Sequence, residues 1–397
     1  MIVLLLCCLF HSLHASWLSA DVIHQMIDRF KKEEAIRSQI SFKGPDRRTS
    51  TPFITGNGFR ANSSIVCDES NACRIHPEHI RDGICVFVKT DFFEFFVKNV
   101  VNRATGSYKL ISHNGDLSAP DGQSDAPRIG MPKYITSDLL EKEYESGRLI
   151  AHHGQNLWWT NVTARPRPAF THCLPIGLEN RQYPVGKYPE VYVEAWIRNI
   201  INQPPLSFSQ ASSLPLLLVA FYPKSRVPDR KNVLTKLHHS QSEIDPTTGQ
   251  PVGKWYNETD LDHIGWLDGV RHHRFVLAPF GHGLDTHRVS EILLMGGVPV
   301  MRRSSISSCY DDSDNEYVER VVVVGGGGSS SLSGAGGAGA ERRHTRGSLP
   351  VVILDSWDEL TRERLEKEWA RLGPLLGTVQ WDWRRLFMDQ WLERVGC

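Results

Sequence analysis

The sequence predicts an α/β protein built from two parallel β-sheets, and three observations indicate this class. The chain has 397 residues, more than a single hydrophobic core usually supports, so two domains are expected. Short apolar runs alternate with helical segments in both halves of the chain, which is the pattern of repeated βα units. Residues 202–213 are rich in Pro, Ser and Gln and have the composition of a linker. We therefore expect two Rossmann-like domains facing each other across a cleft, with the carboxyl ends of both sheets at that cleft.

The first domain is expected over residues 85–205. Its predicted strands are short apolar runs, as in a parallel sheet that is buried on both faces. They are Cys85–Val88, Tyr108–Ser112, Leu149–His152 and Leu174–Gly177. Asp91 and Glu94 have the spacing of a capping box and predict the start of a helix, and a second helix is expected over 136–144.

The second domain is expected over residues 206–397 and repeats this alternation. Its predicted strands are Leu214–Phe221, Phe275–Ala278, Val298–Met301 and Val351–Leu354. A helix is expected over His287–Met295, and Ser356 is expected to cap the first of a final pair of helices. Residues 321–348 contain a Gly, Ser and Ala tract without the G-x-G-x-x-G spacing of a phosphate-binding turn, so we expect a flexible insertion there.

The N-terminus predicts entry into the secretory pathway. Residues 1–20 combine an apolar run, Met1–Phe10, with small residues after it, which is the layout of a signal peptide or a short signal anchor. The run is too short to span a bilayer comfortably. The sequons at Asn62, Asn161 and Asn257 agree with a glycosylating compartment. We expect the ER or Golgi lumen, or secretion, with membrane contact only through an uncleaved leader.

Residues 21–84 are expected to form a stem, because a charged helical segment is followed by a polar stretch without a period. Six cysteines lie beyond the leader, and Cys67 and Cys73 flank a polar loop that predicts a local disulfide. No C-x-x-C or H-x-x-x-H pair accompanies them, so no metal site is expected. Lys plus Arg and Asp plus Glu both number 45, so no net charge favours nucleic acid as a partner.

The strongest candidate site lies between the second and third predicted strands of the second domain. Gly281 and Gly283 allow the backbone to approach a ligand, and a helix begins near Asp285, so its free amides and dipole suit a diphosphate. Arg288 and Glu291 share one helix face, where a guanidinium can clamp phosphate oxygens and a carboxylate can bind ribose hydroxyls. A capped helix whose Arg and Glu pair with each other would give the same pattern.

This segment resembles the exostosin-like glycosyltransferase family, in which a Pro- and Gly-rich turn leads to Asp, Arg and Glu and then to G-x-P-V. Further blocks, in order, resemble poorly characterised microbial and algal members of that family. They are Phe87–Asp91, Ser112–Asp116, Gln155–Asn156, Leu174–Asn180 and Leu349–Trp357. The resemblance runs from about Cys85 to Trp357.

The resemblance implies a GT-B-like fold and the transfer of a sugar from a nucleoside diphosphate sugar, such as a UDP-sugar, to a glycan or glycoprotein acceptor. The second domain would hold the donor. Lys224, Arg226 and Arg230 follow a strand at a point where a cation would reach the leaving diphosphate, and a solvated basic loop is the alternative. Such cations and a helix N-terminus can stabilise the leaving group, so the resemblance implies no cofactor and no metal.

The first domain would then hold the acceptor. Asp116 or His113, in the S-H-N-G-D block after a strand, could be the general base that removes the proton of the acceptor hydroxyl. An Asn-Gly-Asp turn that only caps the next segment is the alternative. Asn156, Trp158 and Trp159 are candidates for a surface that binds sugar rings.

Two other classes of protein share parts of this pattern. A catalytically inactive carbohydrate-binding protein would keep the aromatic surface but could dispense with Arg288 and Glu291. A nicotinamide-dependent oxidoreductase would need a G-x-G-x-x-G turn after its first strand, and the sequence has none. The sequence therefore favours a glycosyltransferase of the secretory pathway.

Overall fold

The computed structural model of the chain describes residues 25, 27–32, 35, 47–120, 137–158, 168–196, 208–221, 227–242, 253–311, 348–376 and 381–397. Several predicted features lie outside these residues. They are the leader, the sequon at Asn161, the site residues Trp159, Lys224 and Arg226, and all but the last residue of the 321–348 insertion. No described helix is both long enough and apolar enough to cross a membrane.

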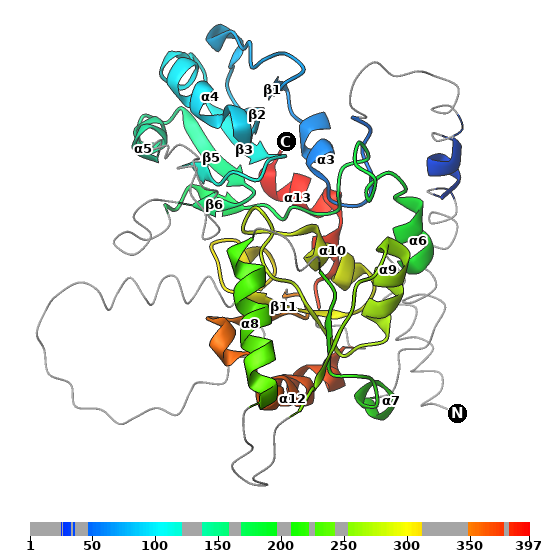
Figure 1. The fold of residues 1–397 in the computed structure, drawn as a ribbon. Coiled ribbons are helices and arrows are strands. Elements are labelled where there is room, and N and C mark those ends of the chain that lie inside the picture. The colour runs from blue at the N-terminus through cyan, green and yellow to red at the C-terminus, as the bar shows by residue number, and fades with distance from the viewer. Residues whose placement is uncertain are drawn as a thin grey trace, which may run out of the picture.

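The first sheet is five-stranded and entirely parallel (Figure 1). Its strands are β1 (Ile65–Cys67), β2 (Ile84–Lys89), β3 (Tyr108–His113), β5 (Leu149–Gly154) and β7 (Thr171–Cys173). They lie in the order β1-β2-β3-β5-β7, so each strand is added on the same side of the preceding one. The helices are α3 (Gly56–Ala61), α4 (Phe93–Asn99), α5 (Ser137–Glu145) and α6 (Glu190–Trp196). A small second ladder joins β4 (Ala119–Pro120) to β6 (Leu157–Trp158).

The second sheet is also five-stranded and parallel, but its strand order reverses once. Its strands are β8 (Leu217–Val219), β9 (Tyr256–Glu258), β10 (Phe275–Leu277), β11 (Val298–Arg302) and β12 (Val352–Leu354), in the order β12-β11-β10-β8-β9. The chain leaves β8 towards one edge of the sheet and returns to β10 on the other side of β8. The point between β8 and β10 is therefore a topological switch point, where ligands of open parallel sheets usually bind.

Helices connect the strands of the second sheet and complete the fold. They are α7 (Phe208–Ser212), α8 (Pro228–Ser242), α9 (His263–Arg271), α10 (His287–Leu294), α12 (Arg362–Leu372) and α13 (Met388–Val395). The predicted α/β class with parallel sheets is thus confirmed.

One hydrophobic core reaches from the first sheet to the second. Along β2, Val86 and Val88 pack with α4 and α5, whereas Phe87 points to the opposite face, as the alternation of a strand requires. The cluster that contains Phe87 also contains Val276 of β10 and Trp391 of α13. The two sheets therefore share apolar packing as well as a chain connection.

Residues 47–84 belong to the first sheet, although the sequence predicted a stem there. The strand β1 pairs in parallel with β2, and Phe59 of α3 is fully buried. The expected disulfide between Cys67 and Cys73 is present directly after β1. The sequence does not reveal β1 because three residues are too short for a periodic signal.

The last residues of the chain return to the first sheet instead of staying with the second (Figure 1). A disulfide joins Cys397 to Cys85 of β2, and the Met388 N–H donates to the Pro52 carbonyl at 2.7 Å. A further disulfide joins Cys173 of β7 to Cys309, which follows β11. Disulfides and hydrogen bonds therefore cross the predicted domain boundary at residue 206.

Two predicted local features also differ. Residues 174–177 follow a strand instead of forming one, because the ladder to β5 ends at Cys173. Helix α4 begins at Phe93, and its N-cap, Phe92, provides no side-chain hydrogen bond, so the expected capping box is absent. Asp91 pairs with Lys89 at 2.9 Å instead.

We expect the packing of α13 to contribute strongly to the stability of the whole chain. The Trp391→Ala substitution removes a side chain that is only 3% exposed, and such truncations typically cost about 3–5 kcal/mol. The free energy of unfolding from denaturant titration measures this loss. Glu393→Ala on the same helix is the control, because the Glu393 side chain is 75% exposed and should change stability little. Equal effects of the two substitutions would contradict the assigned packing.

Candidate functional site

Asn156 joins the carboxyl ends of the two sheets. Its Oδ1 accepts a hydrogen bond from the Asp285 N–H at 2.8 Å, and its Nδ2 donates to the Gly115 carbonyl at 3.4 Å. A Cβ atom on Gly283 would lie 2.3 Å from Nδ2 of Asn156, so this close approach requires glycine. The turn after β10 thus lies against the loops that follow β3 and β5. Asn156 is fully buried in this contact, which leaves no exposed surface for the acceptor role predicted for it.

Asp285 is a buried linking residue at the same junction. Its Oδ2 accepts from the Ile176 N–H at 2.7 Å and from the Tyr310 hydroxyl at 2.9 Å, and its Oδ1 accepts from the Thr286 N–H at 2.8 Å. Burial raises the pKa of Asp285 to about 6, although these hydrogen bonds act in the opposite direction. Both carboxylate oxygens are therefore occupied within the protein, and this geometry favours a linking role over the predicted contact with the donor.

His287 forms a second link between the two sheets. Its Nδ1 lies 2.9 Å from the Gly177 carbonyl, and its Nε2 lies 3.1 Å from the Glu179 carboxylate. Burial alone would lower the pKa of His287, but the hydrogen bond to Glu179, the negative charge of Glu179 and the Gly177 carbonyl raise it to about 9. At neutral pH the ring is therefore an imidazolium that donates from both nitrogens.

Two guanidinium groups lie near each other at the switch point of the second sheet. Arg288 of α10 donates to the Ala220 carbonyl after β8, and Arg230 of α8 donates from Nε to the Phe280 carbonyl after β10 at 3.2 Å. Within the described part of the chain, neither forms an ion pair with a carboxylate. Burial lowers the pKa of Arg288 to about 10; the negative charge of Glu291 opposes this shift and the positive charge of Arg230 adds to it. The sequence-predicted residues Arg230 and Arg288 are thus brought together.

Asp229 holds the turn after β10 in place beside Arg230. Its Oδ2 accepts from the Phe280 N–H at 3.0 Å, and its Oδ1 accepts from Trp357 Nε1 at 2.9 Å. Consecutive residues of α8 therefore bind the N–H and the carbonyl of Phe280. The sequence did not identify Asp229, because only the packing of α8 on this turn gives it a role.

Glu291 points into the protein. Its Oε1 accepts from the Tyr192 hydroxyl at 3.0 Å, and its Oε2 accepts from Trp266 Nε1 at 2.9 Å. Arg288 stacks over the Trp266 ring, with the guanidinium carbon 4.4 Å from the ring centroid. Glu291 therefore orients the support beneath Arg288 instead of pairing with it. To accept a hydrogen bond from a ribose hydroxyl as predicted, Glu291 would have to use lone pairs other than those that accept from Tyr192 and Trp266.

The two predicted general bases differ in their surroundings. His113 is buried, its Nδ1 accepts from the Asn114 N–H at 2.8 Å, and its Nε2 lies 3.2 Å from the Pro175 carbonyl. Burial lowers the pKa of His113 to about 4, so the ring is neutral with its single free lone pair already engaged. Asp116 is exposed at the end of the same loop. The geometry favours Asp116 over His113 as the base.

Of the two tryptophans predicted to bind sugar rings, the structure describes Trp158, which lies on β6 and is only partly buried. His152 and His153, at the end of the neighbouring strand β5, are both buried. His152 is fully buried with its Nε2 2.8 Å from the Ser112 hydroxyl, and burial lowers its pKa to about 3. The His153 ring lies against the His172 ring in a tilted arrangement, with ring centroids 4.9 Å apart.

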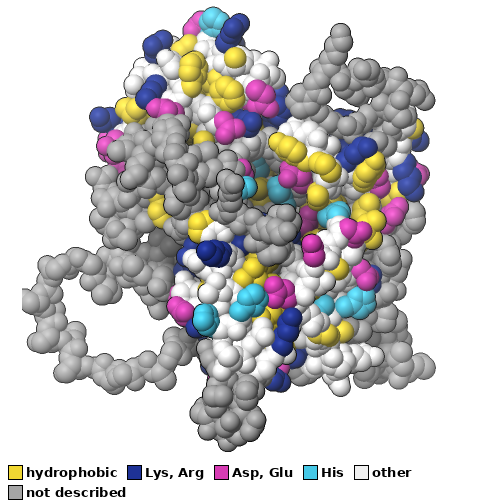
Figure 2. Space-filling model, viewed as in Figure 1, with side chains coloured by type: hydrophobic (Ala, Val, Ile, Leu, Met, Phe, Trp, Pro, Cys, Tyr) yellow, Lys and Arg dark blue, Asp and Glu magenta, His cyan; other side chains and the backbone are white. Residues whose placement is uncertain are grey.

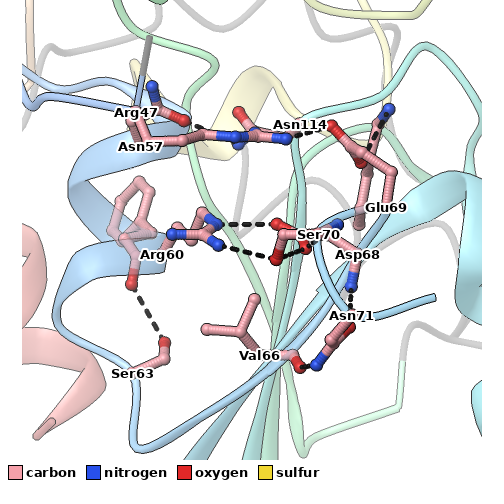
Figure 3. Close-up of polar contacts among 12 residues, drawn as sticks. Arg47, Asn57, Arg60, Ser63, Val66, Asp68, Glu69, Ser70, Asn71 and Asn114 are labelled. Carbon is pink, nitrogen blue, oxygen red and sulfur yellow. Dashed lines mark hydrogen bonds and ion pairs between the residues drawn. The ribbon is translucent and has the colours of Figure 1, made fainter. Parts of the chain in front are cut away.

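A polar cluster at the carboxyl end of β1 was not predicted (Figure 3). Figure 3 shows Arg60 directed at Asp68 and Ser70. The Arg60 Nε donates to Asp68 Oδ2 at 2.6 Å. Burial would raise the pKa of Asp68, but the hydrogen bonds from Arg60 and Ser70 outweigh it and lower that pKa. Glu69 pairs with Arg47 and with Lys89. These charges are matched among themselves, so the cluster fixes the disulfide loop.

Acidic, basic and histidine side chains lie across the middle of the face shown in Figure 2. Among the described residues, no group of three or more His, Cys, Asp and Glu side chains could hold a metal ion.

No known protein-family model matches the chain, and a search of curated proteins finds no match. The function is therefore inferred from the residues and their geometry.

We expect the link through His287 to make stability depend on pH between about 6.5 and 9. The folded state keeps the His287 proton up to about pH 9, whereas an unfolded histidine loses it near 6.5, so the free energy of unfolding should fall as pH rises through this window. The slope contributed by one proton is at most about 1.4 kcal/mol per pH unit. His287→Gln should lack this contribution.

Denaturant titrations at pH 6.5, 7.5 and 8.5 measure this dependence. His272→Gln is the control, since His272 is exposed at the end of α9 and should keep the wild-type slope. A wild-type slope in His287→Gln would show that the pair does not hold its proton in the folded state.

Proposed function

We propose that this chain is a glycosyltransferase that transfers a sugar from a nucleoside diphosphate sugar, such as a UDP-sugar, to a glycan or glycoprotein acceptor. One observation carries the proposal. Arg230 and Arg288 meet at the switch point of the second sheet, and their described polar contacts are to backbone carbonyls and not to carboxylates. Two cations that lie near each other, without an ion pair to a carboxylate among the described residues, suit a dianionic or trianionic ligand.

The chemistry of sugar transfer requires positive charge at this place. Negative charge grows on the leaving diphosphate as the glycosidic bond breaks, and fixed guanidinium groups stabilise that charge without reorganising. Planar guanidiniums also match phosphate oxygens in pairs. The support of Arg288 by Trp266 and of Arg230 by the Phe280 peptide favours such fixed positions.

The acceptor would bind at the carboxyl end of the first sheet. Gly115, the residue before Asp116, is in contact with Asn156, and Asn156 is in contact with the turn after β10, so the loop that carries Asp116 reaches the junction. We infer a GT-B-like use of the two sheets, in which each contributes one wall of the site. Asp116 would accept the proton of the acceptor hydroxyl.

We also infer that the enzyme works in the secretory pathway. Three disulfides join Cys67 to Cys73, Cys85 to Cys397 and Cys173 to Cys309, and such bonds persist in oxidising compartments. The described sequons at Asn62 and Asn257 are exposed, as glycan attachment requires. The test of the function is a screen of the purified chain against UDP- and GDP-sugars, read first as nucleotide-dependent thermal stabilisation and then as transfer to glycan acceptors.

Loss of either guanidinium should weaken donor binding. We expect Arg230→Gln and Arg288→Gln each to weaken UDP binding about 10-fold to 100-fold, which corresponds to roughly 1.5–3 kcal/mol for a charged hydrogen bond. Calorimetric titration with UDP and GDP measures the affinity. Arg364→Gln is the matched control, because its guanidinium pairs with Glu368 at 2.9 Å on α12. Unchanged affinity in both folded site variants would refute the assignment.

Asp116→Asn should separate chemistry from binding. The amide keeps the size of the side chain but does not accept the acceptor proton, so turnover should fall by roughly 10²-fold to 10⁴-fold. UDP affinity should stay at the wild-type value. Asp138→Asn, on the first turn of α5, is the control for loss of one carboxylate charge. If Asp116→Asn keeps its turnover, the proton goes to a different group.

A further inference from the structure

His282 occupies an unusual position between the two halves of the proposed site. Every other residue from Phe275 to Thr286 is buried, whereas His282 is exposed. Among the described residues its imidazole forms no hydrogen bond, ion pair or ring contact. The exposed side chain is therefore accessible to a ligand at this turn, and binding and catalytic residues often lie on loops that a rigid scaffold positions.

The two glycines beside His282 contact opposite sides of the junction. A Cβ atom on Gly281 would lie 3.8 Å from Nη2 of Arg230, at the proposed diphosphate site. Gly283 packs directly on the Asn156 amide, which donates to the carbonyl of Gly115, the residue before Asp116. His282 is therefore bracketed by the proposed donor side and the proposed acceptor side.

The backbone that carries His282 is held at both ends. Before it, the Phe280 N–H donates to Asp229 and the Phe280 carbonyl accepts from Arg230. After it, the Asp285 N–H donates to Asn156, and the Asp285 carboxylate accepts from Ile176 and Tyr310. A side chain on so fixed a turn reaches a ligand at little cost in conformational entropy.

We propose that His282 is a catalytic residue that donates a hydrogen bond to the terminal phosphate of the nucleoside diphosphate, an inference that rests on the proposed glycosyltransferase function. In the transfer step, the acceptor hydroxyl oxygen bonds to the anomeric carbon. The bond from that carbon to the terminal phosphate oxygen breaks, and its electron pair stays on the oxygen. The hydroxyl proton goes to Asp116. The imidazole N–H of His282 stabilises the charge left on the phosphate, together with Arg230 and Arg288.

The test compares UDP with UMP as probes on the full chain, with GDP and GMP measured in parallel. His282→Ala should weaken binding of the diphosphate about 10-fold and leave the monophosphate affinity unchanged, because only the diphosphate extends to the turn. Turnover with the sugar nucleotide should fall about 10-fold to 100-fold. This loss is no larger than the loss of turnover that follows removal of a buried donor to an oxyanion. His282→Gln keeps an N–H donor and should recover part of both losses.

The control is His239→Ala, which removes an exposed imidazole in the last turn of α8, at the end opposite to Arg230. It should change neither affinity nor turnover. Equal thermal midpoints of His282→Ala and wild type without nucleotide would exclude a folding effect.

Three results would overturn the inference. Wild-type UDP affinity and turnover in His282→Ala would show that His282 does not touch the donor, while the proposed function would stand. Lost turnover with unchanged UDP affinity would place His282 on the acceptor proton instead of on the phosphate. If the wild-type chain binds none of the four nucleotides, the proposed function fails first, and the role of His282 fails with it.

Discussion

The contact between the turn after β10 and the loops of the first sheet is the constraint on which the site depends. Asp285 is a buried carboxylate whose pKa is raised to about 6, and it is tolerated only because Ile176, Thr286 and Tyr310 donate to it. These bonds set where α10 begins and hence where Arg288 lies. The same contact buries Gly281 and Gly283 and leaves His282, which lies between them, exposed.

Two acidic residues near the switch point, Asp229 and Glu291, orient the surroundings of Arg230 and Arg288 without forming ion pairs with them. Asp229 accepts from a backbone amide and an indole, and Glu291 accepts from a phenol and an indole, so neither forms an ion pair with Arg230 or Arg288. Asp229 pairs with Arg302 instead, at 3.1 Å. Under the proposed function, the N–H groups of Arg230 and Arg288 that do not bind carbonyls would contact the diphosphate, whereas the matched charges at the end of β1 stabilise a loop.

Much of the candidate site could be predicted because its signal is local. Gly281 and Gly283, with Arg288 one helical turn further on, lie in one continuous segment after an apolar strand, and that segment forms the turn and α10 as expected. Asp229 and His282 could not be found in this way. The role of Asp229 depends on α8 packing against a turn 51 residues away, and His282 stands out only once its neighbours are known to be buried.

The sequence by itself determined the α/β class, most strands of both sheets and the local disulfide between Cys67 and Cys73, because each leaves a signal within a few residues. Only the tertiary structure decided that β1 adds a strand to the first sheet and that the chain after α13 is joined to β2. It also decided that Asp285 and Glu291 turn inward and that His113 is engaged on both ring nitrogens. These outcomes depend on contacts between segments far apart in the chain. A side chain of given chemistry binds a ligand or supports the fold according to which of those segments packs against it.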